Sequence, residues 1–413
     1  MTVFGAIYAK LLRTPAAVVL ACILSGCIME YGDCPDVFAS GEDSGKITVK
    51  FHIVSDGDGR TKAVSDDDFD SENHDSEGSL ADESYVDLSD IRVCLFNKTA
   101  SGSIFLRNLQ IQSTGNNAFM TSFSVPLNAI ADASGTTASF GIMVLANWGS
   151  VGGRYPVMHE MQTSIDDVTD GAFYAFSMAP DWYPGYGARG IPMYGFQTYS
   201  GVSIAELRAS TEAEPYLLYA NGYKDINMLR AMAKVEVADN IRSRTGGYPR
   251  IEDVKIRNWS SGGIYIPESK AFSGAYNQVS APTLPEDQGT YSGARTFRKS
   301  TAYATTTPDW NETVMPDGWW TTYCPEIGYS SASSLPVLDI LVRHRAEGSA
   351  GNGAETQTYT INLPSNFTGS AGMILRNHIY RIEVVNIAAE DELSLVYGIC
   401  EWDRETVTLP DFD

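Results

Sequence analysis

The sequence is short of basic residues. Lysine and arginine together number 29 against 51 aspartates and glutamates, which gives a formal net charge of −22. Binding to the phosphates of nucleic acid needs clustered lysine and arginine side chains, and the sequence has no such cluster. We therefore expect no nucleic-acid partner, and we interpret the acidic excess as a solvated surface.

Motifs for catalysis and for metal binding are also missing. The five histidines are scattered, and the sequence contains no H-E-x-x-H, G-x-S-x-G, C-x-x-C or phosphate-binding glycine loop. Asp56, Asp58 and the run Asp66–Asp68 lack the ordered ligand positions of a calcium loop. We predict that the protein is not an enzyme and that it holds no cofactor and no metal. An exported hydrolase is the remote alternative.

Long hydrophobic runs are absent, since a membrane-spanning helix takes roughly 20 apolar residues. The apolar run over 15–24 is shorter and follows Lys10 and Arg13, as in a secretion signal. Leu24-Ser25-Gly26 before Cys27 resembles the end of a bacterial lipoprotein signal, in which the cysteine is lipidated and becomes the new N-terminus. The resemblance implies a signal peptide over 1–26, acyl chains such as palmitate on Cys27, and a tether over 27–45. Stable anchoring takes two or more such chains.

The acidic residues just after Cys27 resemble the export signal of surface lipoproteins in Bacteroidales-type bacteria, and a hydrated tether would have the same composition. Both interpretations place the protein outside the inner membrane, where disulfides are permitted. Once the signal is removed, Cys34, Cys94, Cys324 and Cys400 remain besides Cys27. Their spacing does not choose among the possible pairings.

Alternating apolar and polar residues predict many short strands, each buried on one face. The clearest lies over 46–54, where Ile47, Val49, Phe51 and Ile53 alternate with polar residues. Other predicted strands cover 91–96, 140–146, 231–237, 254–256, 337–342, 358–363, 379–387 and 393–399, and a short helix over 203–210 is predicted with Ser203 as its cap. This pattern predicts a mainly β fold made of antiparallel sandwiches.

The length of 413 residues predicts two such sandwiches. We place the boundary in the polar segment around 221–227, which gives an N-terminal domain over 46–225 and a C-terminal domain over 226–413. Within the first domain, the acidic, serine-rich segment over 55–84 predicts a solvated loop.

Four segments together resemble the fimbrillin superfamily, the subunits of Bacteroidales-type fimbriae that assemble on the outer surface from lipoprotein precursors. They are CIMEYGDCP at 27–35, IPMYG at 191–195, LRAMAKVEV at 229–237 and RNHIYRIEVVNI at 376–387. The first segment looks most like the anchor subunits of minor and major fimbriae. The other three also have structural interpretations. LRAMAKVEV reads as a sandwich strand with apolar residues on one face and charges on the other, and RNHIYRIEVVNI reads as a strand with bulky groups on both faces. Pro192 and Gly195 of IPMYG read as turn residues.

The resemblance implies two transthyretin-like β-sandwich domains in tandem and a structural role in fimbrial assembly. Stalk subunits of the family lose their first strand by proteolysis after an arginine, and a strand of the next subunit takes its place. Arg60 follows the strand over 46–54 and is the candidate cleavage site. An ordinary loop arginine is the alternative that we favour, because a cut at Arg60 would discard the lipid of an anchor.

Two further features leave alternatives open. The C-terminal segment EWDRETVTLPDFD at 401–413 is either an edge strand of the second domain, which we favour, or a donor strand for the next subunit. Trp182, Trp319 and Trp320 could stack against the sugar rings of a glycan, although packing inside the protein is the favoured interpretation.

We therefore predict a lipid-tethered fimbrial anchor, exposed on the surface of the cell outer membrane. Its partners would be other fimbrial subunits, bound by strand exchange or docking. The alternatives are a tip adhesin or surface lipoprotein that binds glycans or proteins, and a stalk precursor cleaved after Arg60. The sequence does not decide between anchor, tip and stalk.

Overall fold

The structure is a computed structural model of the 413-residue chain. It describes residues 44–55, 83, 85–97, 102–113, 118–169, 175–185, 189–241, 248–267, 293–300, 319–327, 336–345, 354–362, 374–388, 392–401 and 405–406. Contacts within the chain divide it into two units, Met1–Ser44 and Gly45–Asp413. Apart from the first residue of β1, every element described below belongs to the second unit.

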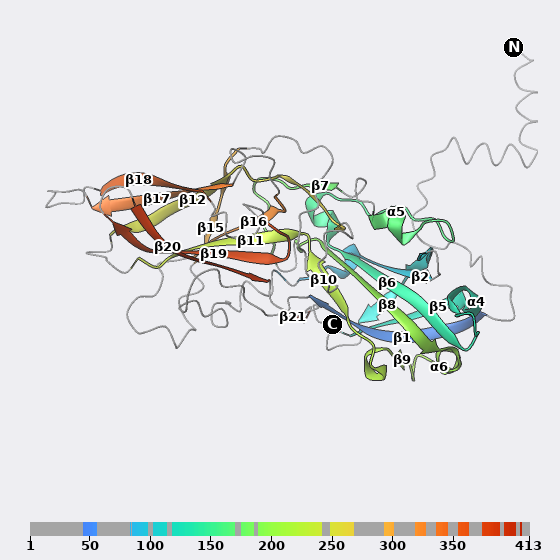
Figure 1. Cartoon of the computed structure of the whole chain (residues 1–413). Coiled ribbons are helices and arrows are strands. Elements are labelled where there is room, and N and C mark those ends of the chain that lie inside the picture. Colours follow the sequence, from blue (N-terminus) through green and yellow to red (C-terminus); the bar gives the residue numbers. More distant parts are fainter. Residues whose placement is uncertain are drawn as a thin grey trace, which may run out of the picture. The chain divides into compact units, whose positions relative to one another are not determined.

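Within the described residues, a ten-stranded sheet gathers most strands of the N-terminal half (Figure 1). Its order is β3-β2-β6-β8-β10-β1-β5-β4, and β9 and β21 also pair with β1. β3 and β5 lie far apart in this order and yet contact each other, so the sheet curls. The strands are β1 Ser44–Ser55, β2 Ile91–Asn97, β3 Phe105–Leu109, β4 Ile111–Ser113, β5 Ala118–Pro126, β6 Thr137–Ala146, β8 Met193–Ser203, β9 Tyr216–Leu217, β10 Ile226–Arg230 and β21 Glu405–Thr406.

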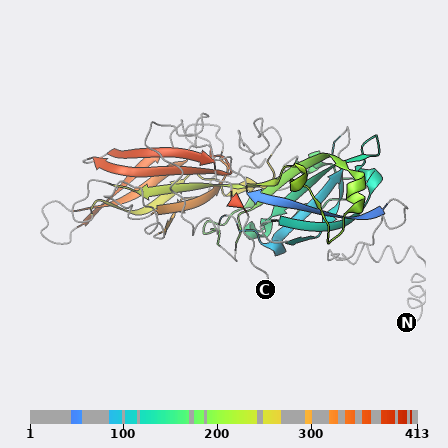
Figure 2. The same cartoon turned by 90° about the horizontal axis from the view of Figure 1, so that it is seen from below.

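The C-terminal half forms two further sheets, drawn one above the other in Figure 1 and seen from below in Figure 2. The five-stranded sheet has the order β15 Arg298–Ser300, β16 Trp319–Pro325, β11 Met232–Asp239, β19 His378–Ala388 and β20 Glu392–Glu401. The four-stranded sheet has the order β14 Arg295–Thr296, β12 Arg250–Arg257, β17 Val337–Arg345 and β18 Ala354–Asn362. Buried aliphatic residues such as Val237 and Ile382 on one sheet and Val254 and Ile340 on the other supply the core of a sandwich.

The remaining elements are short. β7 Ala175–Ser177 pairs with β13 Gly262–Ile264 and so joins segments from the two halves of the chain. The helices are α4 Leu127–Ile130, α5 Ile165–Thr169 and α6 Ile204–Ala209, with 3-10 turns η2 Leu88–Asp90, η3 Trp148–Val151 and η5 Tyr219–Asn221. The predicted cap of α6 is confirmed, because the Ser203 hydroxyl accepts a hydrogen bond from the Glu206 amide. The mainly β fold class is confirmed as well.

The sheets are not wholly antiparallel, which differs from the prediction. β1 runs parallel to β10 and to β9, and β11 runs parallel to β19. Parallel neighbours need long connections between them, and each of these pairs joins strands more than a hundred residues apart in the sequence. Local alternation predicts where a strand lies but not which strand it pairs with, so sequence periodicity gave no sign of these pairs.

The segment LRAMAKVEV is not one strand. β10 ends at Arg230, and β11 begins at Met232 in a different sheet. The Ala231 amide between them donates to the Pro192 carbonyl oxygen. Every residue of β11 is buried, including Lys234 and Glu236, so the charged face that the pattern indicated is not solvent-exposed.

IPMYG is the start of a strand and not a turn. Met193 opens β8, and Gly195 lies inside it, opposite Val144 of β6. A Cβ atom at Gly195 would lie 2.6 Å from the Asn227 carbonyl oxygen of β10. The glycine is therefore explained by the close approach of β10.

The predicted domain boundary between 225 and 226 stays a prediction, as does the count of two tandem domains. Contacts group Gly45–Asp413 into a single unit. Sheet membership changes at Ala231, where β10 leaves the ten-stranded sheet and β11 enters the five-stranded one.

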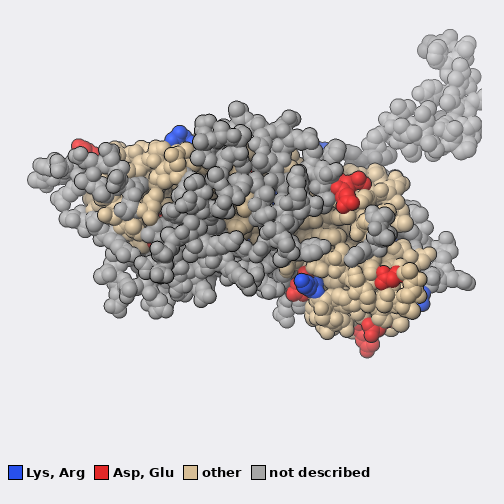
Figure 3. Space-filling view, in the orientation of Figure 1, with Lys and Arg blue, Asp and Glu red and all other residues tan. Residues whose placement is uncertain are grey.

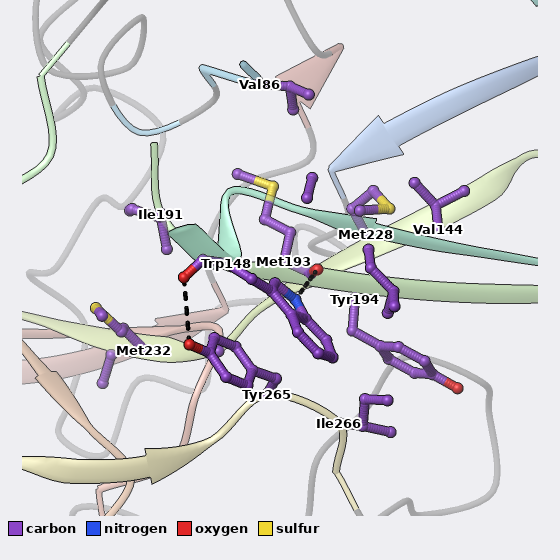
Figure 4. Close-up of a cluster of buried hydrophobic side chains, with 14 of the residues drawn as sticks. Val86, Val144, Trp148, Ile191, Met193, Tyr194, Met228, Met232, Tyr265 and Ile266 are labelled. Atoms are coloured by element: carbon purple, nitrogen blue, oxygen red, sulfur yellow. Dashed lines mark hydrogen bonds between the residues drawn. The ribbon is translucent and has the colours of Figure 1, made fainter. Parts of the chain in front are cut away.

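An aromatic cluster packs where the segment after β6 meets the segment after β13 (Figure 4). The Trp148 ring stacks on Tyr265 at 4.1 Å and on Tyr155 at 5.3 Å between ring centroids. Its Nε1 donates to the Met193 carbonyl oxygen at 3.2 Å, and the Tyr265 hydroxyl donates to the Trp148 carbonyl oxygen at 3.2 Å. Gly153 leaves room for Tyr265, since a Cβ there would overlap the Tyr265 hydroxyl.

Replacing Trp148 by alanine should lower the free energy of unfolding by about 3–5 kcal/mol, because the change empties a fully buried volume. Denaturant unfolding followed by circular dichroism measures this loss. Val157→Ala is the matched control, since Val157 is 70% exposed and its truncation should change stability by less than about 0.5 kcal/mol. Equal effects from the two substitutions would contradict the described packing.

Candidate functional site: the first strand and the buried charges of β11

β1, the first strand after the predicted tether, lies inside the ten-stranded sheet between β10 and β5. Its C-terminal half runs parallel to β10, with Ile53 opposite Ile226. Its N-terminal half runs parallel to β9, with Val49 opposite Tyr216. The strand therefore has neighbours on both sides, which differs from an edge strand that could leave without disturbing a ladder.

Both faces of β1 are covered near its middle. Val49 and Phe51 are almost completely buried, as the alternation predicts, and the Phe51 ring stacks on Phe119 of β5 at 6.2 Å. Thr48, on the face expected to be polar, is buried too, and its amide donates to the Ser210 hydroxyl at 3.0 Å. The segment after α6 runs alongside this part of β1, because the Leu218 amide donates to the Lys50 carbonyl oxygen.

The C-terminal segment also reaches β1. Glu405 and Thr406 of β21 pair antiparallel with Ser55 and Val54. The favoured prediction, an edge strand of the second domain, is wrong for these two residues, because the partner strand belongs to the ten-stranded sheet. Residues 407–413 lie outside the described part of the chain.

Charged side chains fill a second buried site, on β11 and its neighbours. The Lys234 ammonium lies 2.8 Å from Oε1 of Glu83 and 2.6 Å from Oε1 of Glu236, and all three side chains are 1% exposed. Arg381 of β19 holds the other oxygen of Glu236 at 2.7 Å. The Tyr323 hydroxyl of β16 donates to Oε1 of Glu83 at 2.5 Å.

Burial and charge oppose each other at this site. Burial alone would raise the pKa of Glu236, but the positive charges of Lys234 and Arg381 outweigh it and lower that pKa below its ordinary value. For Tyr323, burial and the neighbouring Glu83 both raise the hydroxyl pKa well above its ordinary value. The Tyr323 hydroxyl therefore keeps its proton and donates a hydrogen bond at every physiological pH, and Glu236 is a carboxylate.

Two further buried arginines bind backbone carbonyl groups. Arg376 pairs with Glu326 at 2.9 Å and donates to the carbonyl oxygens of Ile264 and Tyr265 at 2.7 Å each. Arg295 donates to the Thr322 hydroxyl and to the carbonyl oxygens of Ala179, Pro180 and Trp182. Both guanidinium groups tie loops to strands through backbone carbonyls, which is a structural task.

The structure places the residues that the sequence singled out as follows. Cys27 and Arg60 lie outside the described residues. Trp182 is buried, and its indole nitrogen donates to the Ser150 carbonyl oxygen at 2.9 Å. Trp320 of β16 is buried as well, and the backbone of Trp319 pairs with that of Ala238. Buried rings cannot stack on a sugar, so packing explains Trp182 and Trp320 better than glycan binding does.

Cys94 and Cys324 are free buried thiols. Cys94 faces the Asn108 side-chain oxygen at 3.4 Å, and burial raises the pKa of each thiol to about 12. A disulfide that includes either residue is therefore not formed in this structure. Cys34 lies outside the described residues, and for Cys400 only its backbone pairing with Ile379 is described.

Among the described residues, no group of three or more histidine, cysteine or acidic side chains is placed to hold a metal ion. None of the described helices is long and apolar enough to span a membrane. On the face drawn in Figure 3, the described aspartates and glutamates lie in a few separate patches. That face therefore presents no continuous charged surface among the described residues.

Sequence reasoning missed the charge cluster. The alternation in LRAMAKVEV placed Lys234 and Glu236 on one face, which is correct, but it assigned that face to solvent. Glu83 lies at the end of the acidic segment over 55–84, where nothing distinguished it from its neighbours. An alternating charged pair inside an otherwise apolar strand was the only local signal.

No family model and no curated protein matches the chain. Solved structures that resemble it include the tip fimbrial protein Mfa3 from Porphyromonas gingivalis with a C-terminal truncation (13% identity, 87% of this chain and 100% of that one, TM-score 0.45). A candidate cell adhesion protein from Parabacteroides distasonis has 14% identity over 87% of this chain and 98% of that one, with a TM-score of 0.46. A fimbrial assembly protein from the same species has 11% identity over 86% of this chain and 100% of that one, with a TM-score of 0.36. Similarity at this level does not establish membership of a family.

Truncating Phe51 to alanine should lower the free energy of unfolding by about 3–5 kcal/mol, because its ring packs between β1 and β5. Phe51→Leu retains most of the side-chain volume, so it should lower the free energy of unfolding much less. Denaturant unfolding of both variants distinguishes them. An alanine variant as stable as the parent protein would show that β1 does not pack in this position.

In the folded protein at pH 8, Cys94 and Cys324 should resist a thiol-specific alkylating reagent, because burial blocks access and holds both thiols protonated. In guanidinium chloride both should react completely without prior reduction. Peptide mass spectrometry identifies the alkylated residues. If either cysteine reacts only after reduction, it was in a disulfide, and the described free thiol is wrong.

Proposed function

We propose that this chain is a structural subunit of a surface fimbria, held at the outer membrane by lipid on Cys27 as the anchor of the fibre. The proposal combines the lipoprotein-like segment around Cys27 with the position of the strand that follows it. The tether between Cys27 and Ser44 could span up to about 60 Å if fully extended. It leads directly into β1.

The observation that carries the anchor role is that β1 is an interior strand. It pairs with β10 on one side and lies next to β5 on the other, and Val49 and Phe51 belong to the core. A pull on the lipid would therefore act on a strand that is held by main-chain hydrogen bonds along two edges. Such an attachment suits a subunit that bears the load of a fibre.

The same geometry supports the stalk alternative in a different way. If a protease cut after Arg60, the chain would lose β1 and expose the unpaired edges of β5 and β10. A strand of another subunit could then pair there, because main-chain hydrogen bonds do not depend on the donor's side chains. The two roles differ in whether β1 remains attached.

No catalytic role is part of the proposal. Burial of Trp182 and Trp320 also removes two of the three aromatic side chains that favoured a glycan-binding tip. The partners that we propose are other fimbrial subunits, and the location is the exposed face of the outer membrane.

The mature N-terminus on intact cells tests the anchor role. Mass spectrometry of the outer-membrane fraction should find an acylated Cys27 and an uncut peptide spanning Arg60. The Cys27→Ala variant should be released from the membrane with its fimbriae, whereas Cys34→Ala should stay attached. A mature chain that begins at Thr61 would rule out the anchor and favour the stalk precursor.

A further inference from the structure

The Lys234 site brings an amine and a carboxyl group together where solvent is excluded. The Lys234 nitrogen lies 2.8 Å from Oε1 of Glu83, and both side chains are 1% exposed. The two residues come from segments far apart in the sequence, Glu83 just before β2 and Lys234 in β11. Neither side chain can exchange its partner for water without opening the core.

A third group, Glu236, touches the same amine. Its Oε1 lies 2.6 Å from the Lys234 nitrogen, and its Oε2 accepts a hydrogen bond from Arg381 at 2.7 Å. Arg381 therefore fixes the direction of the Glu236 carboxylate. One oxygen faces the amine, where it can take up and return a proton.

A hydroxyl donor faces the carboxyl group. The Tyr323 hydroxyl donates to Oε1 of Glu83 at 2.5 Å. A donor in this position stabilises negative charge on that oxygen, which is where charge would develop if the carboxyl carbon were attacked. The site therefore combines a nucleophile, the Lys234 amine, with an electrophile, the Glu83 carboxyl group. Glu236 can carry protons between them, and the Tyr323 hydroxyl can donate a hydrogen bond to the developing oxyanion.

We propose that Lys234 and Glu83 are joined by an isopeptide bond that forms spontaneously once the protein has folded. A lysine ammonium and a glutamate carboxylate together contain the atoms of one amide and one water molecule. The reaction is neutral in charge, and it needs no oxidant and no external reactant.

The steps balance as follows. Glu236 takes one proton from the Lys234 ammonium and passes it to Glu83, which leaves a free amine beside a neutral carboxylic acid. The amine attacks the Glu83 carboxyl carbon to form the new C–N bond, and Glu236 carries a second proton from the nitrogen to the hydroxyl oxygen of Glu83. The C–O bond breaks, water leaves, and Glu236 is again a carboxylate.

The folded environment favours this outcome in two ways. Holding amine and carboxyl in contact replaces an encounter between separate molecules, which is a large part of the barrier to amide formation. The ion pair also carries the desolvation penalty of two buried charges, and the amide removes both of them.

The bond would link the segment before β2, in the N-terminal half, to a central strand of the C-terminal sandwich. Such a link cannot be lost when the sheets open under load or denaturant. This inference does not depend on the anchor role, because it concerns chemistry within one chain.

Mass spectrometry of the purified, folded protein tests the proposal. The intact mass should be lower by one water molecule than the mass calculated from its measured N-terminus. Trypsin should not cut after Lys234, because acylated lysine is not a substrate. Fragmentation should identify one branched peptide that contains both Glu83 and Lys234.

Variants localise the reaction. Lys234→Arg retains the charge but lacks a primary amine, so it should have the full calculated mass. Glu236→Gln retains a hydrogen-bonding group of the same size but cannot carry the proton, so it should lose water slowly or not at all. Glu252→Gln is the matched control, since Glu252 forms a partly exposed ion pair with Arg250, and it should lose water as completely as the parent protein.

If a variant does not fold, the intact mass and the peptides of the parent protein still decide whether the bond forms. A folded parent protein with the full calculated mass and an unbranched peptide at Lys234 would overturn the proposal and leave a buried ion-pair network. Loss of water at any other pair of residues would overturn it equally.

Discussion

The charge on Lys234 is buried, and much of the surrounding structure is arranged to satisfy it. β11 lies between β16 and β19, and these two strands supply Tyr323 and Arg381 on either side. Glu83, from before β2, completes the set. Removing one partner of such a buried pair leaves an uncompensated charge, which typically costs about 3–5 kcal/mol. The path of the chain from the N-terminal half to β11 is therefore constrained by electrostatics as well as by packing.

The first strand is constrained by its neighbours. β1 is held by β10 on one side and β5 on the other, and the segment from Ser210 to Leu218 hydrogen-bonds to its backbone. β10 is the strand that continues through Ala231 into β11, so the position of β1 and the charge cluster are connected through a few residues of one segment.

Sequence periodicity located many of the strands. β1, β2, β6, β17 and β19 begin and end within a few residues of their predicted bounds, and the Ser203 cap of α6 follows from its spacing to Glu206. Periodicity failed where both faces are buried, because alternation then no longer separates core from solvent. The burial of β11 and of Thr48 in the middle of β1 was missed for this reason. Gly195 was misread for a related reason, since only the neighbouring β10 reveals why a side chain is excluded there.

The sequence by itself determined the β class of the fold, the positions of many strands and the resemblance of the segment around Cys27 to a lipoprotein signal. These features depend on local composition and spacing. Only the tertiary structure decided that β1 is an interior strand, that β10 and β11 belong to different sheets and that Trp182 is buried. Only the tertiary structure, too, brought Glu83 to Lys234. The pairing of β1 with β10 and of Glu83 with Lys234 joins residues more than a hundred positions apart, and local sequence carries no record of such partners.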